Sequence, residues 1–296
     1  MIKKMLLAIA LCSIVLTSQA LDVEHKFTDS NGVKIHYAAA GKGSLMVFIH
    51  GFPDYWYSWH RQMAVLQDNY RVAALDTRGY NKSGQPEQQS DYDMTLLTAD
   101  VAAVIKAEQR DKAIIVGHDW GGVIAWNFVA AYPDLAEKLV IVNLPHPKNM
   151  ARELSNNEEQ RKNAQYARNF QHPESHTRIT AAGLARAHGH TPELHAKYLK
   201  AFENSSFSGM MNYYRQNYPK PPYDKSASAE FPRIAIPVLQ FHGLNDTALH
   251  HAGLNGTWEH LDKDYTLVTI PGVGHWAHHE ASDLVTETIS WWLKMR

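Results

Sequence analysis

Val116-Gly117-His118-Asp119-Trp120-Gly121-Gly122 is the stretch of sequence that decides the fold. It follows an apolar run, residues 113–116, and precedes a run with helical character, residues 123–131. A strand, a tight turn flanked by glycines and a helix, in this order, form the layout of the nucleophile elbow, G-x-Nuc-x-G. Small neighbours allow such a turn to hold its central residue in a strained conformation, with the side chain clear of the sheet. The central residue here is Asp119.

Asp119 stands where a serine is more common, and this changes the chemistry that the turn can support. A serine alkoxide attacks acyl carbon, whereas a carboxylate attacks saturated carbon and leaves an alkyl ester on the enzyme. The alternative is that Asp119 only caps the following helix, because aspartate is a good N-cap residue. Glycines on both sides, directly after a buried strand, favour the catalytic interpretation.

The first twenty residues have the features of a secretory signal. Two early lysines precede an apolar run, residues 5–16, and Ser18-Gln19-Ala20 is a small-x-small cleavage motif. The apolar run is short for a membrane span, so we expect a secreted or periplasmic protein without a membrane anchor. A lipoprotein anchor at Cys12 is disfavoured by the bulky Leu11 before it. Cys12 is the one cysteine, so the mature chain would have neither a disulfide nor thiol chemistry.

Composition gives no indication of several kinds of partner. Without residues 1–20, which hold two lysines and no acids, the formal charge changes from −1 to −3. Such a charge gives no reason to expect nucleic acid or an anionic membrane as a partner. The 18 histidines are scattered, and the group at 275–279 has no second ligand cluster beside it, so we expect no metal. The sequence has no G-x-G-x-x-G nucleotide loop, and it does not choose between a monomer and a dimer.

Strands and helices alternate through the first half of the chain. The alternating segment Val33–Tyr37 predicts an edge strand. A helix with Leu97, Val101 and Val104 on one face precedes Asp119. Continuous apolar runs, which predict strands buried on both faces of a parallel sheet, occur at residues 45–49, 70–75, 113–116 and 139–142. The pattern predicts the α/β class, with a mostly parallel twisted sheet flanked by helices.

The alternation stops at residue 144 and resumes near residue 233. Residues 144–232 are mostly polar and helical in character. Strand patterns return at 237–241 and 265–270, before a final helix with Leu284, Val285, Ile289, Trp292 and Leu293 on one face. We therefore expect a signal peptide at 1–20, a core made of 21–143 and 233–296, and an inserted helical lid at 144–232.

Two further polar residues follow the late strands. Asp246 lies in the loop after one strand and His275 in the loop after the next. Functional groups collect outside the carboxyl ends of parallel strands, so we expect Asp119, Asp246 and His275 to converge. Their chain order, nucleophile, acid and histidine, is that of the α/β-hydrolase fold. In this arrangement Asp119 attacks carbon, and His275, oriented by Asp246, activates water against the resulting ester.

Four motifs resemble those of the α/β-hydrolase epoxide hydrolases, from about residue 26 to the C-terminus. They are Gly117-His118-Asp119-Trp120-Gly121-Gly122, His50-Gly51-Phe52-Pro53, Asp76-Thr77-Arg78-Gly79-Tyr80 and Asn143-Leu144-Pro145-His146-Pro147. The resemblance implies a small-molecule epoxide as substrate, opened by water to a vicinal diol without a cofactor.

The resemblance also implies two lid tyrosines that hold and protonate the epoxide oxygen. Residues 209–215, Gly-Met-Met-Asn-Tyr-Tyr-Arg, are similar to the family's G-x-x-N-[YW]-Y-R element, which places one tyrosine at Tyr214. Tyr166, four residues before a phenylalanine, resembles the other element. A phenol is protonated at neutral pH and can give its proton to a developing alkoxide.

The oxyanion formed during ester hydrolysis needs donors that are already in place. The candidates are the backbone N–H groups of Trp120, next after Asp119, and of Phe52. We further expect His50, Phe52 and Trp120 to line the substrate pocket.

Two other functions fit the same fold. Haloalkane and haloacid dehalogenases share the Asp-His-Asp triad, but they need halide donors such as a lid tryptophan or an asparagine in place of Phe52. None of the eight tryptophans lies within 144–232, and the arginine that fluoroacetate dehalogenases favour after the nucleophile is missing here. A non-catalytic exported effector or binding protein could keep the fold for its pocket alone, but the full set of catalytic residue types argues against it.

We predict that the exported protein begins at Leu21, because cleavage should follow Ala20. N-terminal sequencing of the periplasmic or extracellular protein measures this directly. A cytoplasmic protein that retains residues 1–20 would contradict the prediction.

Overall fold

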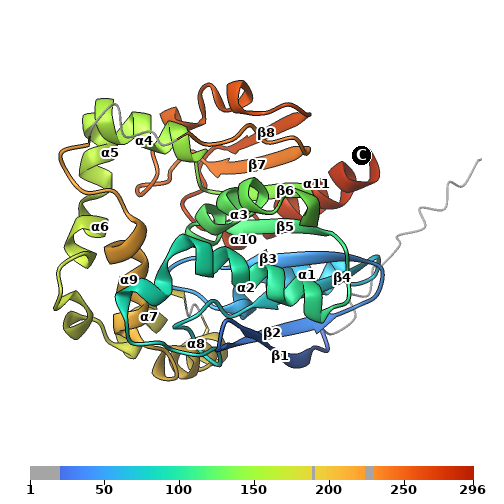
Figure 1. Ribbon diagram of the computed structural model, residues 1–296, viewed down its shortest axis with the longest axis horizontal. Coiled ribbons are helices and arrows are strands. Elements are labelled where there is room, and N and C mark those ends of the chain that lie inside the picture. The colour runs from blue at the N-terminus through green and yellow to red at the C-terminus, as the bar shows by residue number, and fades with distance from the viewer. Residues whose placement is uncertain (1–20, 189–190, 224–229) are drawn as a thin grey trace, which may run out of the picture.

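The computed structural model describes residues 21–188, 191–223 and 230–296 (Figure 1). The expected signal peptide, residues 1–20, lies outside the described residues. A search of the described part of the chain finds no helix that is both long and apolar enough to cross a membrane.

The described residues form one eight-stranded sheet in the order β1-β2-β4-β3-β5-β6-β7-β8. β2 pairs antiparallel with β1 and β4, and all other neighbours pair in parallel, which confirms the predicted α/β class. The strands are β1 (Glu24–Ser30), β2 (Val33–Ala40), β3 (Ser44–Ile49), β4 (Tyr70–Leu75), β5 (Ala113–His118), β6 (Ala136–Val142), β7 (Val238–Gly243) and β8 (Tyr265–Ile270). The four continuous apolar runs of the sequence, and the later strand patterns at 237–241 and 265–270, are thus all strands.

The predicted edge strand is wrong in one respect. Val33–Tyr37 belongs to β2, which lies between β1 and β4, and the edge is formed by β1. β1 has the sequence Glu-His-Lys-Phe-Thr-Asp-Ser, and most of its residues are exposed or only half-buried. A strand this polar gives little hydrophobic signal, because it buries almost no side chain in the core.

Helices cover both faces of the sheet. α2 (Met94–Ala107) packs on α3 (Trp120–Ala131), and α1 (His60–Leu66) packs on α11 (Ser282–Lys294). Across the sheet, the chain moves from β3 to β4 in one direction and then from β4 past β3 to β5 in the opposite direction. Because both connections are right-handed, α1 and α2 lie on opposite faces of the sheet. This change of direction leaves a crevice at the carboxyl ends of β3 and β5, where ligands bind in such sheets.

A group of helices lies between β6 and β7 in the sequence. Figure 1 shows them gathered beside one end of the sheet, away from α11. These helices are α4 (Pro147–Asn156), α5 (Glu158–Asn163), α6 (Gln165–Phe170), α7 (Ala181–His188), α8 (Pro192–Glu203) and α9 (Phe207–Asn217). We refer to them as the lid helices. They fall within the segment 144–232 that the sequence marks as helical.

The buried face of α11 differs from the expected one at a single residue. Val285, Ile289, Trp292 and Leu293 are buried, but Leu284 is 46% exposed. Successive residues of an α-helix are rotated by about 100°, so Leu284 lies outside the stripe that Val285 and Ile289 define.

Two adjacent tryptophans of α11 give a matched test of this packing. Trp292 is fully buried and its indole N–H donates to Thr266 Oγ1 at 3.1 Å, whereas Trp291 is 56% exposed. Trp292→Ala should lower the free energy of unfolding by about 3–5 kcal/mol. Trp291→Ala should change it by less than about 0.5 kcal/mol. Urea unfolding monitored by circular dichroism measures both, and equal effects would contradict the assignment.

Candidate active site

Asp119 occupies a strained turn between β5 and α3. Its φ is 51°, in the left-handed region that residues other than glycine rarely adopt. A Cβ on Gly121 would collide with the backbone carbonyl of Ile49, and a Cβ on Gly117 would collide with that of Gly121. The two glycines therefore let β3, β5 and α3 approach closely enough to form the elbow.

The Asp119 carboxylate lies between two loops of the core. Its Oδ1 accepts a hydrogen bond of 2.8 Å from the backbone N–H of Phe52, in the loop after β3. Its Oδ2 lies 3.5 Å from Nε2 of His275. Asp119 is 6% exposed, so both contacts act in a largely dehydrated environment.

His275 and Asp246 complete a triad with Asp119. They follow β8 and β7, and His275 Nδ1 donates to Asp246 Oδ2 at 2.8 Å. Asp246 Oδ1 accepts from the backbone N–H groups of Ala248 and Leu249 at 2.8 and 2.9 Å. The structure thus brings together the three residues that the sequence placed at the ends of separate strands.

Opposite charges set the protonation of the triad. Burial alone would lower the pKa of His275, but the attraction of Asp246 and the contact with Asp119 outweigh it and raise this pKa to about 10. Burial alone would raise the pKa of Asp119, but His275 and the Phe52 N–H hold it below its usual range. The same competition holds the pKa of Asp246 well below its usual range. At neutral pH Asp119 is therefore a carboxylate and His275 is an imidazolium.

Asp119 opens into a cavity of about 280 Å³ that the predicted lid tyrosines also line. Tyr166 comes from α6 and Tyr214 from α9, and their ring centroids are 6.1 Å apart. Trp120 lines the same cavity, with its ring 5.0 Å from that of Tyr214 in an edge-on arrangement. Burial raises the pKa of each tyrosine well above 10, so both phenols keep their protons at neutral pH.

His50 does not belong to the pocket, in contrast to the prediction. It is fully buried, its Nδ1 donates to the Gly51 carbonyl at 2.8 Å, and its Nε2 accepts from the Thr77 N–H at 3.0 Å. Two backbone contacts thus use both ring nitrogens and fix the loop that carries Phe52. The Phe52 ring packs against Tyr214, with centroids 5.7 Å apart, and is not among the cavity's lining side chains. Of the three predicted pocket residues, only Trp120 lines the cavity.

Comparison with known proteins identifies the family. A profile of the alpha/beta hydrolase fold matches residues 44–282. Epoxide hydrolase 1 of Caenorhabditis elegans is 32% identical over 276 residues, which cover 87% of this chain and 67% of that protein. A point mutant of an epoxide hydrolase from Bacillus megaterium has a TM-score of 0.85 at 29% identity, covering 91% of this chain and 100% of that one. The chain belongs to the epoxide hydrolase family of α/β hydrolases. The AB hydrolase superfamily protein YfhM of Bacillus subtilis is a further relative, 33% identical over 92% of this chain and 98% of that protein.

Two buried residues of this α/β hydrolase support the triad, and sequence reasoning missed both roles. Asn143, directly after β6, donates from Nδ2 to Asp246 Oδ2 at 2.9 Å and to the Gly274 carbonyl at 3.1 Å. His118 donates from Nε2 to the His275 carbonyl at 2.9 Å, and burial lowers its pKa to about 3, so it stays neutral. Their positions in the sequence could have indicated these roles. Both residues stand at the carboxyl end of a parallel strand, on the side of the sheet where the triad lies.

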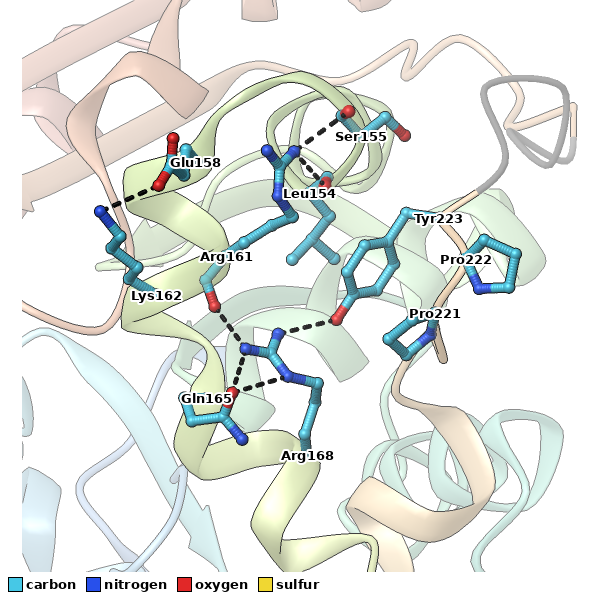
Figure 2. A pocket seen from close by; sticks show the side chains of 10 residues that line it. All are labelled: Leu154, Ser155, Glu158, Arg161, Lys162, Gln165, Arg168, Pro221, Pro222 and Tyr223. Carbon is cyan, nitrogen blue, oxygen red and sulfur yellow. Dashed lines mark hydrogen bonds and ion pairs between the residues drawn. The ribbon is translucent and has the colours of Figure 1, made fainter.

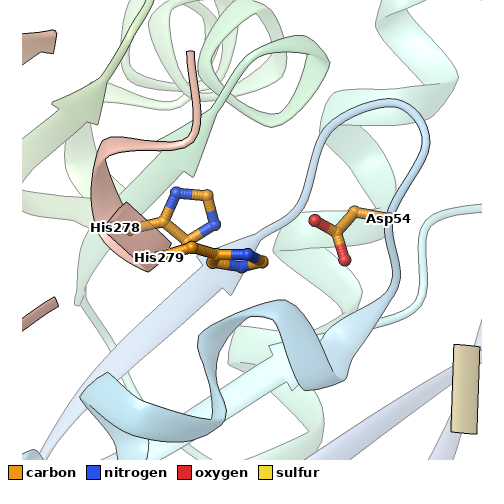
Figure 3. A group of neighbouring side chains, drawn as sticks. All are labelled: Asp54, His278 and His279. Atoms are coloured by element: carbon orange, nitrogen blue, oxygen red, sulfur yellow. The ribbon is translucent and has the colours of Figure 1, made fainter. Parts of the chain in front are cut away.

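A second polar group, formed by Asp54, His278 and His279, lies beside His118 (Figure 3). Ser58 Oγ donates to Asp54 Oδ2 at 2.8 Å and lies 2.8 and 3.0 Å from the Nε2 atoms of the two histidines. These are hydrogen-bond distances. The Ser58 hydroxyl therefore joins the three side chains in one hydrogen-bond network.

A hollow of about 700 Å³ on the lid lies outside this site (Figure 2). Its cations are bound locally: Arg161 donates to the Leu154 and Ser155 carbonyls, and Arg168 donates to the Tyr223 hydroxyl. None of the described residues that line it is a histidine, cysteine or aspartate. The described lining of this hollow therefore lacks the residue types that form the triad.

We predict that Asn143 is needed to hold Asp246 for catalysis. Asn143→Ala and Asn143→Gly should each lower kcat about 10- to 100-fold, because a hydrogen bond to a charged group contributes about 1.5–3 kcal/mol. The two variants separate the loss of the side-chain hydrogen bonds from backbone strain. Asn143 has a φ of 47°, a conformation that glycine adopts without strain. Steady-state kinetics on a good substrate measures both. A glycine variant with the wild-type kcat would show that the side chain is dispensable.

Proposed function

We propose that the protein hydrolyses epoxides to vicinal diols through an ester of Asp119. The observation that carries the proposal is the position of the Asp119 carboxylate, between the Phe52 N–H and His275, in a cavity that Tyr166 and Tyr214 also line. The relatives named epoxide hydrolases in Caenorhabditis elegans and Bacillus megaterium support the same reaction.

In the first half-reaction, Asp119 Oδ2 attacks one carbon of the epoxide. Oδ1 is held by the Phe52 N–H, which leaves Oδ2 as the attacking oxygen. A carbon–oxygen ester bond forms, the ring carbon–oxygen bond breaks, and the ring oxygen takes a proton from Tyr166 or Tyr214. The enzyme then carries a hydroxyalkyl ester and one tyrosinate.

In the second half-reaction, water attacks the ester carbonyl carbon of Asp119. His275 Nε2 takes a proton from this water, and the oxyanion forms on Oδ1, within reach of the backbone N–H of Phe52. The tetrahedral intermediate collapses and expels the diol oxygen, which takes the proton from His275. The regenerated carboxyl group gives its proton to His275, which restores the starting carboxylate and imidazolium, so one water is consumed for each epoxide.

Alkylation itself prepares His275 to act as a base. The charge of Asp119 is one of the causes that raise the pKa of His275, and esterification removes this charge. The pKa of His275 therefore falls once the ester exists. His275 is held protonated during the first half-reaction. It then gives its proton to the tyrosinate, which restores the tyrosine and leaves a neutral imidazole that can accept a proton from water in the second half-reaction.

We also propose that the protein acts outside the cytoplasm, as a secreted or periplasmic enzyme. The proposal rests on the signal-like residues 1–20.

The covalent mechanism predicts that His275→Gln accumulates the ester. Asp119 and the tyrosines still open the ring in this variant, but the base that activates water is missing. Intact mass spectrometry after mixing with an epoxide should show a gain equal to the whole substrate, located on the peptide that contains Asp119. Single turnover of the wild-type enzyme in ¹⁸O-labelled water should place the label in Asp119 and not in the first diol formed.

The controls distinguish the steps. Asp119→Ala in the His275→Gln background should lose the adduct, and the double variant Tyr166→Phe/Tyr214→Phe should form it at least ~10²-fold more slowly. Direct attack of water on the epoxide would instead give no adduct in any variant and label in the first diol. Release of halide from haloalkanes, without diol formation from any epoxide tested, would favour a dehalogenase.

A further inference from the structure

The cavity extends away from Asp119 along one face of α3. Trp120, Val123 and Asn127 all line it, and their spacing of three and four residues places them on one side of the helix. Seven residues separate Trp120 from Asn127, which corresponds to about 10 Å along the helix axis. A substrate that reacts at Asp119 therefore has room for one long substituent that points toward Asn127.

The wall along this path is apolar. Met94 from α2, Leu144 after β6, Met150 from α4 and Leu249 after β7 line the cavity together with Val123. Among the described residues that line it, Asp119 is the one charged side chain. The middle of the substituent must therefore be apolar, because a polar group there would lose its hydration without gaining a partner.

Two asparagines give the cavity a polar part away from the triad. Asn127 donates from Nδ2 to the Val123 carbonyl at 2.8 Å. Asn217, one turn beyond Tyr214 at the end of α9, donates from Nδ2 to the Tyr92 and Tyr213 carbonyls at 2.8 and 3.2 Å. Both N–H groups of Asn217 and one of the two of Asn127 are bound to backbone, so each asparagine keeps its amide oxygen, which is an acceptor, for a ligand.

We infer that the preferred substrate is an epoxide on an apolar chain that ends in a hydrogen-bond donor, such as a hydroxyl group. The inference rests on the proposed epoxide hydrolase activity and assigns recognition of the donor to Asn127, with Asn217 beside the same cavity. A volume of 280 Å³ holds roughly nine non-hydrogen atoms at about 30 Å³ each. An extended chain advances about 1.2 Å per bond, so about eight bonds span the 10 Å from Trp120 to Asn127. The compound 7,8-epoxyoctan-1-ol, with ten non-hydrogen atoms and eight bonds from its terminal epoxide carbon to its hydroxyl oxygen, is close to both figures.

The test compares 7,8-epoxyoctan-1-ol with 1,2-epoxynonane, in which a methyl group replaces the hydroxyl. Wild-type enzyme should favour the hydroxylated epoxide in kcat/KM, and Asn127→Leu should lower this preference about tenfold, since one hydrogen bond is lost. Asn156→Leu is the matched control. Asn156 donates to the Arg152 carbonyl at 2.8 Å in the same i to i−4 pattern, but it is exposed on α4 outside the cavity. It should leave the preference unchanged.

A binding measurement on wild-type protein makes the test independent of turnover and of the folding of any variant. Calorimetry should show 1,2,8-octanetriol binding about tenfold more tightly than 1,2-nonanediol. Equal or weaker binding of the triol, or an unchanged preference in a folded Asn127→Leu variant, overturns the inference. Hydrolysis of both epoxides with no preference overturns it while leaving the proposed function intact. If no epoxide is hydrolysed, the proposed function fails. The affinities of 1,2,8-octanetriol and 1,2-nonanediol then still show whether the cavity recognises the hydroxyl group.

Discussion

The hydrogen bond from the Phe52 N–H to Oδ1 of Asp119 is the contact on which the rest of the site depends. It joins the loop after β3 to the turn after β5, and these two strands are neighbours only because the chain reverses its direction across the sheet after β4. The glycines of the elbow permit the close approach, and the buried His50 fixes the loop from behind. The sheet topology therefore places the oxygen that must carry negative charge beside a donor before any substrate binds.

Charge balance explains why two buried carboxylates and one histidine are stable together. Each carboxylate contacts His275, and Asp246 also accepts hydrogen bonds from two backbone N–H groups and from Asn143. An unpaired buried charge would shift its pKa until it became neutral. Here the imidazolium lies between the two anions and keeps all three groups ionised. In the proposed mechanism the charge of the triad first changes when Asp119 forms a bond to carbon.

The sequence predicted the elements that bury apolar side chains and the residues that end parallel strands. β3 to β8 have continuous or alternating apolar patterns, and Asp119, Asp246 and His275 stand directly beyond their carboxyl ends. β1 gave no signal because an exposed edge strand has no hydrophobic period. The pocket assignment of His50 was wrong, because a motif position does not reveal whether a side chain turns toward substrate or toward backbone. The role of Asn143 depends on the packing of β6 against the loops after β7 and β8, which local sequence does not encode.

The lid helices enter the fold after β6 and leave it before β7, two strands that lie side by side in the sheet. Their insertion therefore leaves the order of the core strands undisturbed, so a different lid could occupy this place without a change in the sheet. The choice of lid is limited by Tyr198 of α8, whose hydroxyl donates to Asp54 Oδ1 at 3.1 Å within the Ser58 network. A replacement lid without this hydroxyl leaves a buried carboxyl oxygen with one donor fewer. A different lid on this core must therefore supply a donor to Asp54, or the Asp54 network must change with it.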